Sequence, residues 1–171
     1  MSEASEGYLL DTNIASLAFD AGRKEHVEVR ERLSKLGEET IFICPVSVGE
    51  VEYGLKVACP ADETRQNVVR KALGNYETLL IDRHTAESYS TIRAELFNKY
   101  GIKRSSGKFK TKYVEELIDP TSGKELGIQE NDLWIASVAI QYNLVFITSD
   151  HAEGMRRIIE AAGHEARTEY W

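Results

Sequence analysis

Short apolar runs alternate along this chain with stretches in which apolar residues recur at helical spacing. A run of four or five apolar residues between polar ones is typical of a strand buried on both faces, whereas a spacing of three to four indicates one face of a helix. The predicted strands are 7–10, 41–44, 78–81, 144–148 and a short final one at 164–168. The predicted helices are 12–20, 24–36, 45–58, one that Asp62 caps, 84–100, 132–142 and 152–162. In the helix after Asp62 we expect Val68, Val69 and Leu73 to face inward.

Strands that alternate with helices predict an α/β domain with a central, mainly parallel sheet and helices on both faces. We expect residues 1–6 to be a flexible N-terminus and residues 7–171 to form a single domain. The discordant part is 102–129, which is rich in Lys, Ser, Gly and Thr and contains the turn signals Asp119-Pro120 and Ser122-Gly123. It is interpreted as an inserted loop or hairpin with a short helix at 113–117, and with little apolar periodicity to contribute to the core.

The composition fits a globular cytoplasmic protein. The chain has 171 residues, enough for one domain with a sizeable core, and its 42% hydrophobic content argues against disorder. No apolar stretch is long enough to span a bilayer, and the polar, acidic start argues against a secretory signal. Cys44 and Cys59 lack metal-type spacing and adjoin apolar residues, so they are interpreted as reduced core cysteines.

Four carboxylates stand just after a hydrophobic run or in the first turn of a predicted helix, namely Asp11, Glu50, Asp132 and Asp150. If the strands are parallel, these positions meet at one edge of the sheet, where α/β proteins bind ligands. Carboxylates gathered at one point repel each other unless a cation lies among them, and an all-oxygen set suits Mg²⁺ or Mn²⁺. The neighbouring polar residues that could orient such ligands are Thr12, Asn13 and Ser149.

Each acid also has a structural explanation as a helix cap, and for a single acid that explanation is the commoner one. The candidate caps are Asp11, Glu50 in a capping box with Ser47, Asn131 or Asp132, and Asp150. Their joint placement at one sheet edge favours the metal site instead.

Three motifs, in this order, resemble the PIN-domain family and, within it, the VapC-like toxins of type II toxin–antitoxin pairs. They are LLDTN at 9–13, VSVGEVEYGL at 46–55 and NDLWIASVAIQYNLVFITSD at 131–150, and STIRAEL at 90–96 is also similar. The resemblance runs from Tyr8 to about Ile159. It implies a three-layer PIN-like fold and metal-dependent cleavage of RNA, with the catalytic and metal-binding roles falling on the same four acids. It also implies a cognate antitoxin and a homodimer.

The 102–129 segment departs from the family, in which only a few residues commonly separate the positions of Gly101 and the Asn-Asp pair. It therefore predicts an effect on the choice of substrate or partner. The chain has a formal net charge of −7, yet 99–112 holds six basic residues and no acid. RNA binding is assigned to Lys103, Arg104, Lys108, Lys110 and Lys112, with Tyr100, Phe109 and Tyr113 as stacking rings. The alternatives are a solvated mobile loop and an antitoxin contact.

The leading hypothesis is a Mg²⁺- or Mn²⁺-dependent ribonuclease that needs no protein nucleophile. A second is a PIN-like domain that binds RNA or protein without cutting. A third is a phosphoryl-transfer domain of receiver or phosphatase type. The third is disfavoured because the DTN motif lacks a second aspartate two positions on, and because no Lys follows a strand as in a receiver.

Overall fold

The protein is described by a computed structural model that covers residues 7–37, 40–163 and 166–171. Five parallel strands form its sheet, in the order β3-β2-β1-β4-β5. They are β1 (Gly7–Leu10), β2 (Thr40–Ile43), β3 (Glu77–Thr78), β4 (Val145–Thr148) and β5 (Arg167–Tyr170). The predicted α/β class with a parallel sheet is confirmed. The strand order reverses direction between β1 and β4, which makes this point the topological switch of the sheet.

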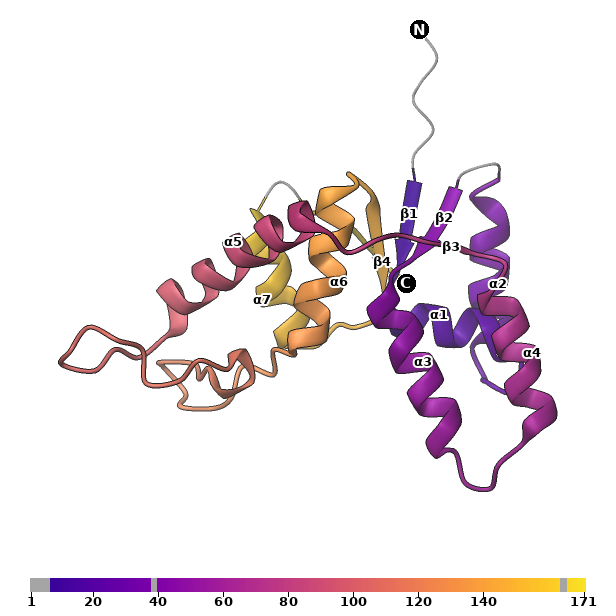
Figure 1. The fold of residues 1–171 in the computed structure, drawn as a ribbon, viewed down its shortest axis with the longest axis horizontal. Helices are drawn as coiled ribbons and strands as arrows, with labels where there is room; N and C mark the ends of the chain where they lie inside the picture. The colour runs from indigo at the N-terminus through magenta and orange to yellow at the C-terminus, as the bar shows by residue number, and fades with distance from the viewer. Residues whose placement is uncertain (1–6, 38–39, 164–165) are drawn as a thin grey trace, which may run out of the picture.

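Helices cover both faces of the sheet (Figure 1). They are α1 (Thr12–Phe19), α2 (His26–Lys35), α3 (Pro45–Val57), α4 (Glu63–Leu73), α5 (Arg83–Tyr100), α6 (Glu130–Gln141) and α7 (Glu153–Ala162). Alternate strand residues explain the layering: in β1, Tyr8 and Leu10 pack against α1 and its neighbours, whereas Leu9 packs in the cluster that holds Ile135 of α6. Apolar residues are needed on both faces, hence the unbroken apolar runs.

Three details differ from the predictions. Val68 is 56% exposed, and the buried side chains of α4 are Val69 and Leu73, because adjacent helical residues point about 100° apart. The strand predicted at 78–81 is instead the short edge strand β3 at Glu77–Thr78. After β3, the Leu79 N–H donates to Ile43 O at 3.0 Å, and the chain then leaves the sheet. The final strand is Arg167–Tyr170 rather than 164–168, of which 164–165 lie outside the described residues.

The expectations from composition are met in part. Both cysteines are free, and Cys44 is buried as predicted, but Cys59 is exposed and is not a core residue. It follows the last residues of α3 on a connection to α4, where apolar neighbours in sequence do not imply burial. No helix in the described ranges is both long and apolar enough to cross a bilayer.

The 102–129 segment contributes to the core, contrary to prediction. Its antiparallel pairs are Lys103 with Phe109 and Ile118 with Glu125, and a 3₁₀ turn at Val114–Glu116 matches the predicted short helix. The buried side chains that it packs against α5 and α6 are Val114, Leu117, Leu126 and Ile128. Because the segment has little regular structure, its buried residues follow no fixed period, which is why the sequence pattern gave no signal for them.

Gly154 in the first turn of α7 allows the 102–129 segment to approach the body of the protein closely, because it has no Cβ atom. A Cβ atom at Gly154 would lie 2.0 Å from the carbonyl oxygen of Gly127, so backbone would have to move. We expect Gly154→Ala to lower the free energy of unfolding by about 1–3 kcal/mol in urea titrations, as overpacking does. Gly54→Ala in α3 is the matched control, since its Cβ would meet no atom within 4 Å and a helical Ala is favoured over Gly. Equal stability of the two variants would contradict the close approach.

Candidate functional site

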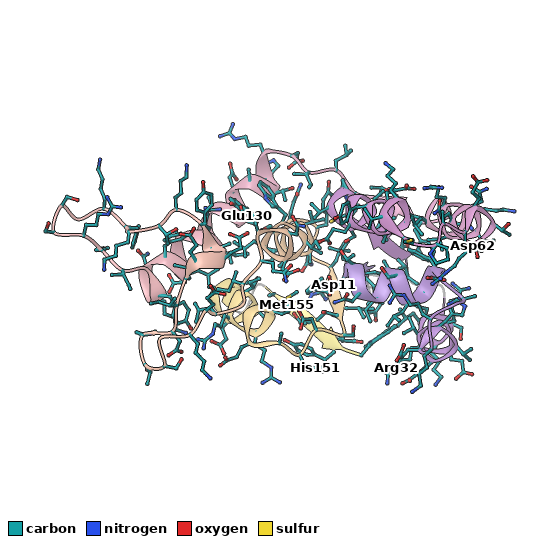
Figure 2. All side chains as sticks on the ribbon, turned by 90° about the horizontal axis from the view of Figure 1, so that it is seen from below. Asp11, Arg32, Asp62, Glu130, His151 and Met155 are labelled. Carbon is teal, nitrogen blue, oxygen red and sulfur yellow. The ribbon has the colours of Figure 1, made fainter. Side chains whose placement is uncertain are left out.

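Four elements bring the four acids to the edge of the sheet at which its strands end. Asp11 follows β1, and Asp150 follows β4 after one intervening residue, so these two flank the switch point. Glu50 lies in the second turn of α3, and Asp132 lies in the first turn of α6. Figure 2 is viewed from the side of this edge and shows Asp11 near its middle. All four are close enough to interact electrostatically: Asp132 is repelled by each of the other three.

Asp11 is the most rigidly held of the four. It is only 2% exposed, and its own N–H donates to Ile147 O at 2.9 Å, which extends the pairing of β1 with β4. Its Oδ1 accepts from Thr12 N–H and its Oδ2 accepts from the Thr148 hydroxyl, both at 2.7 Å. Asp11 therefore does cap α1, as the structural alternative proposed. That cap occupies one carboxylate oxygen and fixes the other toward β4.

Thr148 is a site residue that the sequence reasoning missed. It is fully buried, donates to Asp11, and accepts from the Asp150 N–H at 2.9 Å. It thus connects the two acids that flank the switch point. The available signal was a hydroxyl residue at the end of a buried strand, two positions before an acid.

Glu50 is not part of a capping box. Helix α3 begins at Pro45, a favoured first helical residue, and Cys44 occupies the N-cap, so Ser47 stands inside the helix. The Glu50 carboxylate instead accepts from the Thr12 hydroxyl and, at 2.8 Å, from Asn131 Nδ2. Glu50 therefore connects the starts of α1 and α6, and its carboxylate lies at the edge of the sheet that carries the other acids.

The remaining two acids are not helix N-caps either. Gln129 is the N-cap of α6, so Asp132 lies within the first turn. Ala152 is the N-cap of α7, and Asp150 Oδ1 accepts from the Ala152 N–H at 2.7 Å in a turn before that helix. The capping explanation therefore holds for Asp11 alone.

The cluster carries negative charge that no described basic residue neutralises through an ion pair. Burial, with smaller contributions from the charges of Asp150 and Glu50, raises the pKa of Asp11 to about 6, although the hydrogen bonds from Thr148 and Thr12 act to lower it. Burial also raises the pKa of Asp132 to about 7, with added repulsion from the other three acids. Such an arrangement is typical of sites that bind a cation.

The donor set fits a hard divalent cation, because every donor is a carboxylate oxygen and the charge is uncompensated. Among the described residues, however, no group of three His, Cys, Asp or Glu side chains is arranged to hold one ion. The hydroxyl and amide groups of Thr12, Thr148 and Asn131 hold the carboxylates of Asp11 and Glu50 instead. In this structure the acids form a cluster of like charge rather than a closed metal cage.

The raised pKa of Asp132 gives a pH-dependent stability prediction. The folded protein binds this proton more tightly than the unfolded chain, so ionised Asp132 costs stability increasingly as pH rises from about 4 to about 7. In EDTA, Asp132→Asn should match wild type near pH 4 and exceed it by about 1–3 kcal/mol near pH 7. Urea unfolding at a series of pH values measures this. A stability difference that does not change with pH would contradict the prediction.

The other residues that were predicted to belong to the site do not all lie beside the four acids. Thr12 contacts Glu50, but Asn13 is exposed, and neither Asn13 nor Ser149 hydrogen-bonds the four acids within the described chain. Glu130, two positions before Asp132, is paired with Arg93 at 2.7 Å and does not join the four acids. The basic residues assigned to RNA binding lie in the 102–129 segment and not among the acids; they are Lys103, Arg104, Lys108, Lys110 and Lys112.

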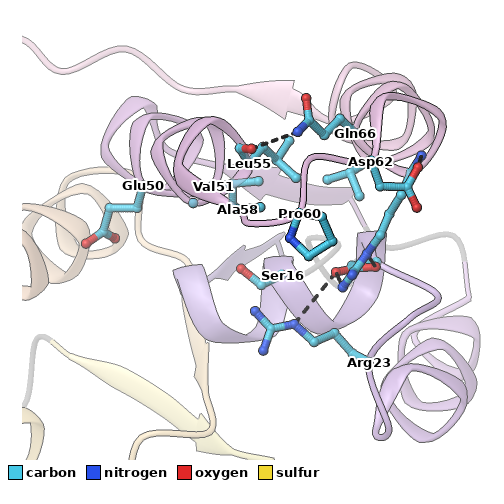
Figure 3. Close-up of a pocket in the computed structure, with 13 residues that line it drawn as sticks. Ser16, Arg23, Glu50, Val51, Leu55, Ala58, Pro60, Asp62 and Gln66 are labelled. Atoms are coloured by element: carbon cyan, nitrogen blue, oxygen red, sulfur yellow. Dashed lines mark hydrogen bonds and ion pairs between the residues drawn. The ribbon is translucent and has the colours of Figure 1, made fainter.

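A separate pocket of about 270 Å³ lies between α1, α3 and α4 (Figure 3). Its lining includes Val51, Leu55, Val69 and the ion pair of Asp20 with Arg65. Of the four acids only Glu50 reaches it, and the Glu50 carboxylate points away from the pocket toward α6. The pocket is therefore a neighbour of the acid cluster and not its centre.

Comparison with solved structures supports the fold. A chain of VapBC2 from Rickettsia felis, solved bound to a DNA fragment from their promoter, has a TM-score of 0.65 at 25% identity, covering 96% of this chain and 98% of that one. A chain of DNA-bound VapBC from Salmonella typhimurium scores 0.64 at 23% identity, covering 97% and 98%. A chain of VapBC-5 from Mycobacterium tuberculosis, of the VapBC family of toxin–antitoxin systems, scores 0.56 at 21% identity, covering 96% of each chain.

The comparison with protein families is the more specific one. No curated protein gives a significant sequence match. The model of the PIN domain matches residues 8–160, a span that contains all four acids and runs from β1 into α7. The match covers most of the chain, and it agrees with the resemblance carried by the three sequence motifs. The chain belongs to the PIN-domain family.

Proposed function

We propose that this protein is a Mg²⁺- or Mn²⁺-dependent endoribonuclease. The observation that carries the proposal is the convergence of Asp11, Glu50, Asp132 and Asp150 at the switch point of a parallel sheet without a basic partner among the described residues. Family membership supports it. A non-catalytic domain has no need of four mutually repelling acids, two of them with strongly raised pKa values.

The four acids are the residues that would hold the metal. A bound ion would offset their repulsion, activate a water molecule for attack on an RNA phosphate and stabilise the leaving oxygen. Thr148 and the Thr12 N–H orient Asp11, while the Thr12 hydroxyl and Asn131 orient Glu50. Thr148 is fully buried and is therefore no candidate nucleophile. Water as the attacking group means that products carry no 2′,3′-cyclic phosphate.

The experiment is sequencing of the 5′ ends of RNAs cut by the purified chain, with Mg²⁺ or with EDTA. We expect defined cleavage sites in Mg²⁺ that EDTA removes, and mass spectra of the products without a cyclic phosphate. Ends that persist in EDTA, or that the Asp11→Asn variant produces equally, would refute a metal-dependent reaction at this site.

We further propose that the chain is a cytoplasmic toxin, acts as a homodimer and is held inactive by a cognate antitoxin. The similarity to chains of solved VapBC complexes supports this. Induced expression of the chain alone should arrest bacterial growth, and expression of Asp11→Asn at the same level should not. Arrest by both variants would refute toxicity through cleavage.

The alternative is a PIN-like domain that binds RNA or protein without cutting it. It predicts RNA binding that Asp11→Asn leaves intact, together with no cleavage by wild type in either metal. The receiver-type alternative is disfavoured by the strand order, since receivers have the order 2-1-3-4-5 and this sheet has 3-2-1-4-5.

A further inference from the structure

Residues 102–112, here called the basic hairpin, form an ordered projection at the end of the molecule away from α2 and α4 (Figure 1). Its two strands are joined by Arg104 N–H to Lys108 O and by Lys110 N–H to Ile102 O, each at 2.8 Å. The turn passes through Gly107 with φ of +80°, a conformation that favours glycine. The segment is thus a hairpin closed by backbone hydrogen bonds, with a tight turn at its tip.

The positive charge of the basic hairpin is unpaired. Its five basic side chains are exposed, and in the described parts of the chain none forms an ion pair; they are Lys103, Arg104, Lys108, Lys110 and Lys112. The nearby acid Glu116 accepts from the Thr111 hydroxyl instead. Like charges concentrated on one projection of a chain with net charge −7 repel each other, and an anionic partner would relieve that repulsion.

One aromatic ring beside these charges is open to a ligand. A hollow of about 380 Å³ is lined by four of the cations together with Phe109 and Tyr113. Tyr113 is 52% exposed, and Lys112 Nζ lies 5.3 Å from its ring centroid. The other two predicted stacking rings are engaged: Tyr100 is buried, and Phe109 packs on Phe97 at 5.2 Å. Clustered cations with a single free ring suit the phosphates and one base of a single strand.

The basic hairpin is connected to the start of the helix that carries Asp132. Arg93 of α5 donates to the backbone carbonyl of Lys112 and, at 2.7 Å, to both carboxylate oxygens of Glu130. Glu130 is the first residue of α6, two positions before Asp132, and Figure 2 shows it between Asp11 and the hairpin end of the molecule. The position of the hairpin relative to the acids is therefore fixed by side-chain contacts and by the packing of 114–128.

We propose that the basic hairpin holds the phosphates of single-stranded RNA beyond the cleaved bond, while Tyr113 stacks on one of its bases. This inference rests on the proposed function, because it assigns the substrate of the acid cluster to a second contact surface. Duplex DNA and an acidic protein segment are the competing occupants.

The test measures binding of an unstructured RNA of about 20 nucleotides by fluorescence anisotropy in EDTA, over a range of KCl concentrations. Alanine at Lys108, Lys110 and Lys112 should weaken binding at least about tenfold at low salt. It should also reduce the slope of log affinity against log salt by about 2, since each single-strand phosphate contact contributes about 0.7. The matched control places alanine at Lys24, Lys35 and Lys71, which are exposed, form no ion pair in the described chain and lie on or next to α2 and α4.

Tyr113→Leu gives an independent readout. It should lower RNA affinity about fivefold or more at every salt concentration without changing the slope, because stacking carries no charge. Circular dichroism should show all variants folded, since these side chains are exposed.

Equal affinity and parallel salt dependence of wild type and the Lys variant would overturn the hairpin proposal. The proposal would also be overturned if the Lys variant lost more affinity for duplex DNA of the same length than for RNA. It would likewise be overturned if the Lys variant lost its affinity for an acidic peptide while its affinity for RNA stayed unchanged. Cleavage in Mg²⁺ separates the two proposals. If wild type cleaves RNA but the Lys variant keeps the wild-type salt slope, only the hairpin proposal is refuted. If the Lys variant has a reduced salt slope but wild type cleaves no RNA, only the ribonuclease proposal is refuted.

Discussion

RNA cleavage should fall at least about 100-fold when Asp11 is replaced by Asn, while the metal-free protein stays folded. Loss of a partner that merely orients a ligand costs about 10- to 100-fold, and loss of the ligand itself should cost no less. Asn can still accept from the Thr12 N–H, and it removes the carboxylate charge whose burial raises the pKa of Asp11. We therefore expect the melting temperature in EDTA to be equal to or higher than that of wild type.

Asp62→Asn is the matched control, because Asp62 is also a helix N-cap and accepts from Arg65 N–H away from the acids. Asn is as good an N-cap as Asp, so both variants should fold. Only Asp11→Asn should lose activity, measured as the rate of cleavage of one labelled RNA in Mg²⁺. If Asp11→Asn unfolds by circular dichroism, or cleaves at the wild-type rate, Asp11 serves the fold and not the reaction.

A similar loss is expected for Glu50→Gln. A capping residue would tolerate Gln, which can still accept a hydrogen bond, whereas a metal ligand loses its charge. The structure removes the capping explanation, since Glu50 bonds Thr12 and Asn131 instead of the start of α3. Gln can keep one of these bonds, so we expect cleavage to fall about 100-fold or more with little change in melting temperature.

Glu63→Gln removes the same charge from an exposed position in the first turn of α4 and should retain wild-type activity. Cleavage rates of the two variants on the same RNA make the comparison. Full activity in Glu50→Gln would exclude Glu50 from the site, whatever the fate of the other acids.

Much of the sheet could be predicted because its signal is local. The apolar runs of β1 and β4 are unbroken since both faces are covered, and the polar residue after each run marks the ligand-binding edge. The edge strand β3 was misplaced because a strand paired on one side needs few residues, and Leu80 beyond it is exposed although it is apolar. Val68 was misplaced because its side chain points about 100° away from that of Val69 around α4, and only Val69 of the two is buried.

The positions of the acids could be inferred, but their hydrogen-bond partners could not. That Asp11 and Asp150 share an edge follows from parallel strands. That Thr148 binds Asp11, and Asn131 binds Glu50, depends on the register of β1 with β4 and on the approach of α6 to α3, which residue spacing does not encode. The burial of Val114 and Leu126 likewise depends on tertiary packing without a sequence period.

The most direct test of the acid cluster as a metal site does not require knowledge of the RNA target. It is the melting temperature of EDTA-treated protein during titration with Mn²⁺ or Mg²⁺. Binding at 100 times Kd stabilises the folded state by about 2.7 kcal/mol, a rise of roughly 5–10 °C for a chain of this size. We expect that rise for wild type and for Asp62→Asn, and its loss in Asp11→Asn and Glu50→Gln. No rise in wild type, or the same rise in all four proteins, would contradict a divalent-metal site built from these acids.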